Sequence, residues 1–431
     1  MPSKKTSSSA ATTKLDDVNR DGILRILTDK INVTPPVGER YEFLLRALIE
    51  ASIDEFGVKL TSADRKSLVE EIFSYAASYG PIEQYFSDPQ ISEIMVNGPD
   101  QVYIERIDKT GEMIFTDSLF DDNDHVRFAI NHIINPMGRY INAKHPLVDS
   151  RLPDGSRVNV VIPPVSPNGP CITIRKFLKD KLTVEQLVEL GSLTPQIADF
   201  LSVCVESSLN VVVSGNTSSG KTTFLNNLAH AIPDRERIVT IEDSAELNLN
   251  QTHVVTLEAQ PADYQGEGAV SVRDLVRNAL RMRPDRIIVG EVRGGEALDM
   301  LQAMNTGHDG SLTTVHSNSP RDTLARIETM SMMSGIELPL TALRKQIASA
   351  LNLIVHLSRF PDGSRRLTHV TEVVGMEGDI ITMTDLFLFR QTGVDENRRI
   401  VGEYRATGLR PSFSDAFEIA GKRLDHKLFS N

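Results

Sequence analysis

A glycine-rich segment in the middle of the chain has the residue types that bind phosphate groups. Residues 215–222 read Gly-Asn-Thr-Ser-Ser-Gly-Lys-Thr; an apolar run precedes them and a helical pattern follows. A strand that delivers such a loop to a helix N-terminus exposes backbone N–H groups where the helix dipole favours negative charge. Lys221 would then reach the β- and γ-phosphates of a nucleotide, and Thr222 would ligate Mg²⁺. The predicted nucleotide-binding residues of this loop are Gly215, Asn216, Thr217, Ser218, Ser219, Gly220, Lys221, Thr222 and Thr223.

A second apolar strand pattern ends in an acid. Residues 285–294 read Asp-Arg-Ile-Ile-Val-Gly-Glu-Val-Arg-Gly, so Glu291 follows directly after the expected strand and Gly290. In a sheet that carries a phosphate loop, an acid at the carboxyl end of a neighbouring strand lies near the γ-phosphate. There Glu291 can hold Mg²⁺ through water or polarise the attacking water, while Arg293 orients or neutralises it. We predict that both are catalytic residues; the alternative is a structural Glu291–Arg293 salt bridge.

The same design occurs a second time, at residues 238–247, which read Ile-Val-Thr-Ile-Glu-Asp-Ser-Ala-Glu-Leu. We predict that Glu242 adds a catalytic carboxylate to the magnesium and water site. The alternative is that these acids cap the next turn, since Asp and Ser favour that position. Asp243 and Glu246 fit both interpretations. The predicted Mg²⁺ ligands, direct or through water, are Thr222, Glu242 and Glu291.

A histidine-containing stretch follows at residues 306–320, which read Thr-Gly-His-Asp-Gly-Ser-Leu-Thr-Thr-Val-His-Ser-Asn-Ser-Pro. His308 and His316 are separated by an expected strand, and no Cys or His-Glu-x-x-His pattern supports a metal site of their own. At the end of a strand beside a phosphate loop, Thr314 and His316 would emerge near the γ-phosphate. We predict that His316 is a catalytic sensor of that phosphate and that His308 also contacts the nucleotide; the alternative for each is a packed or turn-capping histidine.

Three arginines surround a turn earlier in the chain. Arg151 and Arg157 flank the turn formers Asp154 and Gly155, and Arg175 ends the run Ile-Thr-Ile-Arg. A hairpin that projects arginines is suited to gripping a γ-phosphate across an interface. On spacing alone, however, a solvated hairpin is the simplest interpretation.

A further arginine stripe precedes the second acidic segment. Arg273, Arg277 and Arg281 recur every four residues, so they share one face of the expected helix. Such a stripe is usually solvated or ion-paired. In a ring of subunits it would instead meet a neighbour, and the spacing does not separate the two interpretations.

The elements that position these motifs fall into four regions. Residues 1–20 are polar and read as a disordered tail, and residues 21–80 carry apolar positions at helical spacing, which predicts a small helical bundle. Residues 81–180 alternate short β-type runs with turn formers around one helical segment, which predicts an α+β domain. Residues 181–431 alternate helical patterns with apolar strands, which predicts an α/β sheet covered on both faces.

Strand and helix positions are predicted within these last two regions. In the α+β region we expect strands at residues 94–96, 102–107, 113–115, 157–162 and 172–175, with a helix near 125–134. In the α/β region we expect strands at residues 210–213, 238–241, 253–257, 286–289 and 310–315.

Composition restricts the class of protein. The 431 residues carry a formal net charge of −12, which argues against broad nucleic-acid binding. Cys171 and Cys204 form no Cys-x-x-Cys pair, so they are expected to be ordinary buried thiols. The start of the chain lacks the apolar core of a secretory signal, and no apolar run approaches the ~20 residues of a membrane helix. We therefore expect a soluble cytoplasmic protein that meets the membrane only through a partner.

Taken in order, these motifs resemble those of a known family. The loop at residues 215–222, the acidic segment at 238–247, the Gly-Glu strand end at 285–294 and the histidine stretch are similar to the Walker A, Asp-box, Walker B and His-box motifs of the type II/type IV secretion and pilus-assembly ATPases. The similarity also includes the segments around Arg151 and Arg175. Within that superfamily, the lack of a four-cysteine zinc module argues against the export ATPases of type II secretion and the extension motors of many type IV pili. The chain looks most like the motors of Tad (Flp, or tight-adherence) pili, in which a helical bundle precedes the middle domain.

The resemblance implies a fold and a function. It implies a RecA-like phosphate-loop domain preceded by a PAS-like α+β domain and a helical bundle, in a hexameric ring that binds ATP and Mg²⁺ in a cleft between the two domains. It implies a motor at the cytoplasmic face of the inner membrane that acts on a platform protein to add or remove pilin subunits. It also implies that Arg151, Arg157 and Arg175 sense the nucleotide at a domain or subunit interface, which replaces the solvated hairpin.

Alternatives remain at this point. Within the same superfamily they are a type IV secretion traffic ATPase and an archaeal pilus or archaellum motor. Outside motor function, the chain could be a nucleotide-dependent assembly switch with little turnover. A nucleic-acid translocase would need a basic channel, which the net charge does not favour.

Overall fold

The computed structural model describes residue 15 and residues 18–107, 112–177, 182–260, 262, 267–414, 417 and 429. The chain divides into two compact units, Met1–Lys179 and Asp180–Asn431. Most of the expected tail at residues 1–20 lies outside the described residues. Helices and sheets occur in both units, which confirms the mixed α/β class that the sequence predicted.

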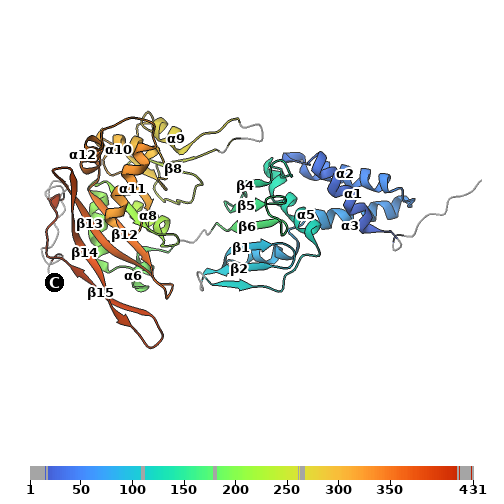
Figure 1. Cartoon of the computed structure of the whole chain (residues 1–431), viewed down its shortest axis with the longest axis horizontal. Helices are drawn as coiled ribbons and strands as arrows, with labels where there is room; N and C mark the ends of the chain where they lie inside the picture. The colour runs from blue at the N-terminus through green and yellow to red at the C-terminus, as the bar shows by residue number, and fades with distance from the viewer. Residues whose placement is uncertain are drawn as a thin grey trace, which may run out of the picture. The chain divides into compact units, whose positions relative to one another are not determined.

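Three helices form a bundle at the start of the first unit (Figure 1): α1 (Arg20–Val33), α2 (Tyr41–Phe56) and α3 (Ser62–Ala76). The side chains of Asn19 and Thr61 accept backbone N–H groups at the start of α1 and α3, which fixes where these helices begin. The apolar positions predicted at helical spacing, such as Leu45, Ile49 and Leu68, are buried in one core. A short helix, α4 (Glu83–Ser87), follows the bundle.

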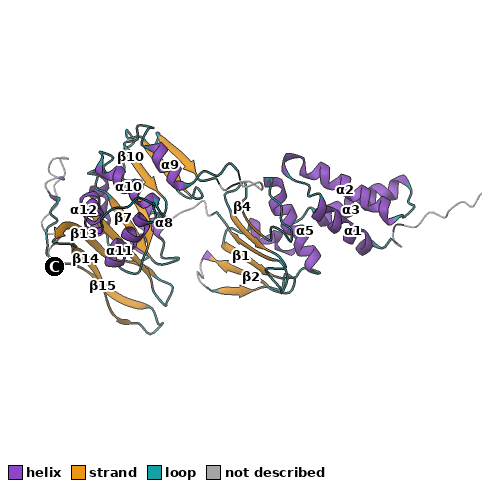
Figure 2. Cartoon of the chain, turned by 45° about the horizontal axis from the view of Figure 1, so that its top comes forward, coloured by secondary structure: helices purple, strands orange, loops and turns teal. Residues whose placement is uncertain are grey.

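An antiparallel sheet makes up the rest of the first unit. Its described strands are β1 (Ile91–Asn97), β2 (Val102–Arg106), β3 (Met113–Phe115), β4 (Leu147–Arg151), β5 (Arg157–Val161) and β6 (Cys171–Arg175), in the order β3-β2-β1-β6-β5-β4. Helix α5 (Asn123–Ile134) packs Val126 and Ile130 on the sheet core while Phe128 enters the bundle core. Figure 2 shows α5 beside the helices of the bundle. The sheet and the bundle therefore share one helix.

The second unit is built on a sheet with nine described strands (Figure 1), in the order β15-β14-β13-β12-β7-β11-β10-β8-β9. The strands are β7 (Val211–Gly215), β8 (Ile238–Glu242), β9 (Val254–Glu258), β10 (Arg286–Val289), β11 (Leu312–His316), β12 (Leu353–Arg359), β13 (Arg365–Glu377), β14 (Ile380–Val394) and β15 (Ile400–Ala406). The strands from β12 to β9 in this order pair in parallel, and those from β12 to β15 pair antiparallel.

Helices cover both faces of the parallel part of this sheet. The described helices of the second unit are α6 (Val184–Glu189), α7 (Pro195–Glu206), α8 (Lys221–Ala229), α9 (Val272–Ala279), α10 (Glu296–Asn305), α11 (Pro320–Met332) and α12 (Leu340–Ala350). Because alternate side chains of a strand point to opposite faces, Val211 and Val213 belong to the core with α7 and α8, while Val212 belongs to the core with α9 to α12. This arrangement explains the continuous apolar strand patterns of the sequence.

Two further properties concern the whole described chain. No helix in the described ranges is long and apolar enough to span a membrane. Cys171 and Cys204 are both free thiols; Cys204 is buried, while Cys171 is only partly buried, so the expectation of buried thiols holds for one of them.

Candidate functional site

Four motif residues reach one edge of the second sheet because their strands run in parallel. In the strand register, His316 at the end of β11 lies opposite Gly215 at the end of β7. Val289 of β10 lies opposite Ile241 of β8, so Glu291 and Glu242 follow at the same edge. In an open α/β sheet, ligands bind at the carboxyl ends of the strands. The candidate site is therefore at this edge of the second unit.

The phosphate loop connects β7 to α8. All of β7 is buried, the loop follows from Asn216, and α8 begins at Lys221. A Cβ atom at Gly215 would lie 2.3 Å from the carbonyl oxygen of Leu357, so only glycine fits where β7 approaches β12. The Ser219 hydroxyl is buried without a partner among the described residues. A hydroxyl without a partner, close to a helix N-terminus, can donate to a phosphate oxygen.

Three motifs meet in one chain of polar contacts. The Nζ atom of Lys221 lies 3.3 Å from Nδ1 of His316 and donates to the Asn216 carbonyl oxygen at 3.0 Å. On the other side of the ring, Nε2 of His316 lies 3.1 Å from Oε1 of Glu291. Because the lysine ammonium can only donate, Nδ1 must accept and Nε2 must carry the proton. The structure therefore links the phosphate loop to the Glu291 carboxylate through neutral His316.

Arg293 holds the other oxygen of the same carboxylate. Its Nη2 atom donates to Oε2 of Glu291 at 2.8 Å, and its Nη1 atom lies 3.4 Å from Oδ2 of Asp243. Burial raises the pKa of Glu291, but the hydrogen bond and charge of Arg293, with the charges of His316 and Lys221, offset this and leave the pKa below its usual value. Glu291 is therefore ionised at neutral pH, the state in which a carboxylate can orient a water and accept its proton.

The electrostatic environment keeps His316 neutral. Burial is the main cause that lowers its pKa, and the positive charge of Lys221 adds to it, followed by Arg293 and Arg326. Glu291 opposes this shift without reversing it. The lowered pKa of His316 thus agrees with the neutral form that the hydrogen bond from Lys221 requires.

Glu242 is placed at the same edge but is held by the backbone. Its carboxylate oxygens accept the N–H groups of Glu246 and Leu247 at 3.0 to 3.2 Å, and its side chain is 4% exposed. A Cβ atom at Gly290 would lie 2.7 Å from its Cγ atom, so Gly290 makes room for this side chain. Glu242 makes the turn-capping contacts that the sequence left as the alternative. Its role at the magnesium and water site stays a prediction.

His308 is not brought to this cluster. It precedes β11, whereas His316 ends the strand, and a five-residue strand is about 16 Å long. Its backbone N–H bonds Ala303, and its carbonyl oxygen accepts the Ser311 hydroxyl at 2.8 Å. Within one chain His308 is thus at the opposite end of the strand from the phosphate loop, which does not fit the expected nucleotide contact.

The three predicted arginines of the first unit line up across neighbouring strands. Arg151 of β4 lies opposite Arg157 of β5, and Arg157 lies opposite Arg175 of β6. Residues directly opposite one another in an antiparallel pair share a face of the sheet. Arg175 in turn lies opposite Glu93 of β1, with 3.9 Å between the charged atoms. We call Arg151, Arg157 and Arg175 the arginine row.

The arginine stripe of the second unit is partly ion-paired. Arg273 and Arg277 of α9 both donate to the Asp299 carboxylate of α10, through their Nε atoms at 2.7 and 2.8 Å. Asp299 is 6% exposed, so these contacts fix α9 against α10. For these two arginines, an ion-paired face is the interpretation that the structure supports.

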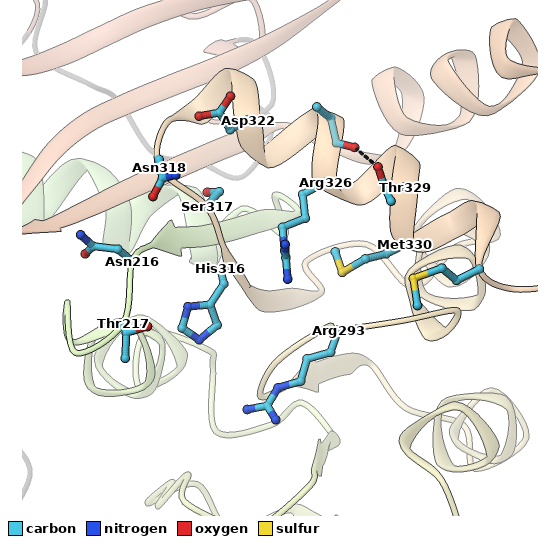
Figure 3. A pocket seen from close by; sticks show the side chains of 12 residues that line it. Asn216, Thr217, Arg293, His316, Ser317, Asn318, Asp322, Arg326, Thr329 and Met330 are labelled. Carbon is cyan, nitrogen blue, oxygen red and sulfur yellow. Dashed lines mark hydrogen bonds between the residues drawn. The ribbon is translucent and has the colours of Figure 1, made fainter.

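An open cavity of about 620 Å³ lies beside the phosphate loop (Figure 3). Predicted residues on its wall are Asn216, Thr217, Arg293 and His316. The sequence analysis missed the residues that complete it, which are Ser317, Asn318, Asp322, Ala325, Arg326, Thr329, Met330 and Met333. They belong to α11 and its flanks. The exposed positions Ala325 and Arg326 between buried Leu324 and Ile327 are a signal that one face of this helix is turned away from the core.

Another residue that the sequence analysis missed lies behind the phosphate loop. Nδ1 of His356 on β12 lies 2.9 Å from the hydroxyl of Ser214, which directly precedes Gly215. His356 is 2% exposed, and burial, aided by the charge of His369, lowers its pKa to about 4. It is therefore neutral and ties the end of β7 to β12. Only the strand pairing reveals this contact, because 142 positions separate the two residues.

The donor atoms suit Mg²⁺ held together with a nucleotide. In the described parts of the chain, no group of three or more His, Cys, Asp or Glu side chains could hold a metal ion by itself. Mg²⁺ is normally bound through one or two carboxylates, substrate phosphates and water. The Thr222 hydroxyl at the start of α8 and the ionised Glu291 carboxylate are oxygen donors of this kind.

A buried parallel strand, a glycine-rich loop and a helix N-terminus define a phosphate-loop protein. Residues 75–405 match the family model described as type II/IV secretion system protein. The chain therefore belongs to the type II/IV secretion system protein family, as its motifs predicted.

Individual relatives agree with this family. One relative is a Mycobacterium tuberculosis protein whose provisional name is conjugal transfer protein. It is 36% identical over 71% of this chain and 87% of its own length. The type IV secretion system protein PtlH of Bordetella pertussis is 35% identical over 66% of this chain and 91% of its own length. The crystal structure of the VirB11 ATPase from the Brucella suis type IV secretion system shares 30% identity over 67% of this chain and 94% of its own, with a TM-score of 0.37.

Proposed function

We propose that the chain is an ATPase that converts ATP hydrolysis into mechanical work. The observation that carries this proposal is the chain of contacts from Lys221 through His316 to Glu291 and Arg293. It joins the group that would hold the β- and γ-phosphates to the carboxylate that would face the attacking water. A carboxylate in this position can orient the attacking water as well as hold Mg²⁺.

Hydrolysis of ATP can be written with these groups and one water molecule. Glu291 orients a water and accepts a proton from it as the water oxygen attacks the γ-phosphorus in line with the leaving group. The bond from the γ-phosphorus to the bridging oxygen breaks, and ADP leaves with both electrons of that bond. The proton passes from Glu291 to solvent or to the phosphate product. Each Glu291 oxygen keeps a lone pair beyond those bonded to His316 and Arg293, so water can still donate to it.

His316 and Lys221 would report whether the phosphate is present. A γ-phosphate at the start of α8 would compete with Nδ1 of His316 for the Lys221 ammonium. The imidazole would then be free to turn, and its contact with Glu291 would change. Mg²⁺, held by Thr222 and Glu291 directly or through water, would neutralise charge on the β- and γ-phosphate oxygens.

We propose that the arginine row also contacts nucleotide phosphate. Three guanidinium groups on one face of a sheet are donors of the kind that grip phosphate oxygens. The family resemblance assigns these arginines to nucleotide sensing. They would respond to ATP and release on hydrolysis.

We propose that the protein works as a homo-hexamer with a RecA-like second unit, at the cytoplasmic face of the inner membrane. Its partner would be the platform protein of a Tad (Flp) type pilus, and its work would be the assembly, or also the retraction, of that pilus. The second candidate is a type IV secretion traffic ATPase. The names of the relatives from Bordetella pertussis and Mycobacterium tuberculosis favour it.

A binding and turnover measurement tests the ATPase proposal. The wild-type protein is expected to bind ATP and Mg²⁺ and to release phosphate continuously, without stimulation by DNA. Lys221→Ala is expected to weaken nucleotide binding about 10- to 100-fold, because it removes a charged hydrogen-bond donor. The exposed Lys345 of α12 supplies the control, since Lys345→Ala should change neither property.

Two results would overturn this proposal. Equal nucleotide affinity of Lys221→Ala and the wild type would remove the phosphate loop from the account. Tight ATP binding by the wild type with negligible phosphate release would instead identify an assembly switch.

A further inference from the structure

The cavity beside the phosphate loop contains a cation with no acidic partner. Arg326 of α11 lines this cavity and is exposed. Figure 3 shows its side chain extending from α11 into the cavity, on the side where His316 and Arg293 lie. Within the described ranges it makes no hydrogen bond or ion pair. A guanidinium without a carboxylate partner is available to an anionic ligand.

The other charges of the cavity make this arginine distinct. Arg293 already donates to Glu291 and lies beside Asp243. Asp322 is four residues before Arg326, a spacing that commonly gives an ion pair on a helix, yet no such pair forms here. Figure 3 shows the two side chains extending in opposite directions from α11. Arg326 is thus a positive charge that the fold leaves uncompensated.

Arg326 is also close enough to the candidate catalytic residues to influence them. Its positive charge is one of the causes that lower the pKa of His316. Nε2 of His316 in turn lies 3.1 Å from Oε1 of Glu291, where the attacking water would be oriented. The cavity wall continues from Arg326 past His316 to Asn216 and Thr217 of the phosphate loop. A phosphate leaving the γ-position would therefore meet Arg326 along the wall of this cavity.

We propose that this cavity binds the inorganic phosphate product and that Arg326 is its principal ligand. The proposal rests on the ATPase function proposed above, because hydrolysis supplies the phosphate. A free phosphate carries on the order of two negative charges near neutral pH, and a guanidinium donates two parallel N–H bonds to such an oxyanion. The hydroxyl of Thr217 and the side-chain amide of Asn318 add neutral donors on the same wall.

This site would order the release of products. Phosphate held by Arg326 is separated from ADP at the phosphate loop, so the reverse attack on ADP becomes less frequent. Its departure would leave Arg326 and His316 without the anion. The state of the cavity would then differ before and after phosphate release, although ADP is bound in both.

Phosphate binding at equilibrium tests the proposal with the full chain. Inorganic phosphate is titrated against protein saturated with ADP and Mg²⁺, and binding is followed by the line width of the phosphorus NMR signal. We expect the wild type to bind phosphate and Arg326→Ala to bind it about 10- to 100-fold more weakly. Arg326→Lys, which keeps the charge without the planar fork, should be intermediate.

The same helix provides a matched control. Arg321 of α11 is exposed and lines a different, smaller pocket, so Arg321→Ala should bind phosphate like the wild type. Thermal unfolding of each variant shows whether the fold is kept. If Arg326→Ala does not fold, the comparison of Arg326→Lys with Arg321→Ala still tests the role of the guanidinium.

The outcomes separate this inference from the ATPase proposal. If the wild type fails to bind ADP in a parallel titration, the proposed function fails. If ADP binds and phosphate binds equally well to the wild type, Arg326→Ala and Arg326→Lys, the phosphate site is contradicted while the ATPase proposal stands. Absence of any phosphate binding by the ADP-bound wild type contradicts it too.

Discussion

Two nitrogen atoms of a single imidazole connect the phosphate loop to the candidate catalytic carboxylate. Nδ1 of His316 accepts from Lys221, which only the neutral form can do, and Nε2 lies 3.1 Å from Oε1 of Glu291. Protonation would place a second N–H against the lysine ammonium. The lowered pKa of His316, caused first by burial and then by the charge of Lys221, keeps it in the neutral form.

Replacing His316 by Ala is expected to uncouple binding from turnover. The phosphate loop would remain, so the affinity for ATP should change little. The turnover number should fall about 100-fold, because Glu291 would lose one of the two contacts that orient it. His253, an exposed histidine before β9, gives the control substitution His253→Ala. If His316→Ala released phosphate at the wild-type rate, His316 would have only a packing role.

The wild-type pH profile gives a second reading of the same residue. The folded protein disfavours protonated His316, so the pKa of this residue is lower in the folded than in the unfolded state. Neutral His316 therefore contributes its stability and its part in turnover above pH ~6.5, and both are lost as the pH falls through the lowered pKa. The acid limb of the turnover profile should therefore lie below pH ~6.5. His316→Ala should lack that limb.

At the scale of side chains, the sequence predicted which types would meet but not how they would bond. Glu291, Arg293 and His316 were predicted to lie near the γ-phosphate, and the structure brings them together. The capping contacts of Glu242 were left open because an acid after a strand can face either the site or the next turn. Arg326 was missed because an arginine on a helix is usually solvated, and only the cavity shows what it faces.

Parallel strands are the elements that create the site, since they bring four carboxyl ends to one edge. This arrangement explains why a glycine stands at position 290, directly after β10: the Glu242 side chain occupies the space next to the Cα atom of Gly290. A bulkier residue at this position would push Glu242 out of its contacts with the backbone of Glu246 and Leu247.

Gly290→Ala is therefore expected to destabilise the second unit and to lower turnover. A Cβ atom 2.7 Å from Cγ of Glu242 must displace a buried side chain, which costs on the order of 1–3 kcal/mol. The free energy of unfolding in urea measures this effect. A Cβ atom added at Gly393 of β14 would meet no other atom within 4 Å, so Gly393→Ala is the control. An unfolding free energy of Gly290→Ala equal to that of the wild type would contradict the packing explanation.

At the scale of elements, most strands with a strong apolar pattern were predictable, with the buried β12 as an exception, and exposed strands were not. The strand at residues 286–289 was predicted with its observed bounds, because it is apolar and buried on both faces. β4 was missed because its side chains are exposed or half-buried and give no clear alternation. The antiparallel strands β13 to β15 were missed for the same reason over part of their length, since many of their residues face solvent. Periodicity detects burial, and a strand without it gives little signal.

The whole molecule separates its chemistry between two units. The first unit holds the arginine row, and the second holds the phosphate loop, Glu291 and His316. Each unit has its own apolar cores. A formal net charge of −12 is consistent with a partner other than nucleic acid. Mechanical work would then follow from nucleotide-dependent contacts of the arginine row.

Glu291→Gln is the substitution that tests the account most directly. Glutamine keeps the size and the hydrogen-bonding capacity of the side chain but cannot accept a proton from water at neutral pH. ATP binding should be intact, and phosphate release at saturating ATP should fall at least about 100-fold relative to the wild type. Turnover near the wild-type rate, with ATP bound equally well, would contradict the assignment of Glu291 and with it the proposed mechanism.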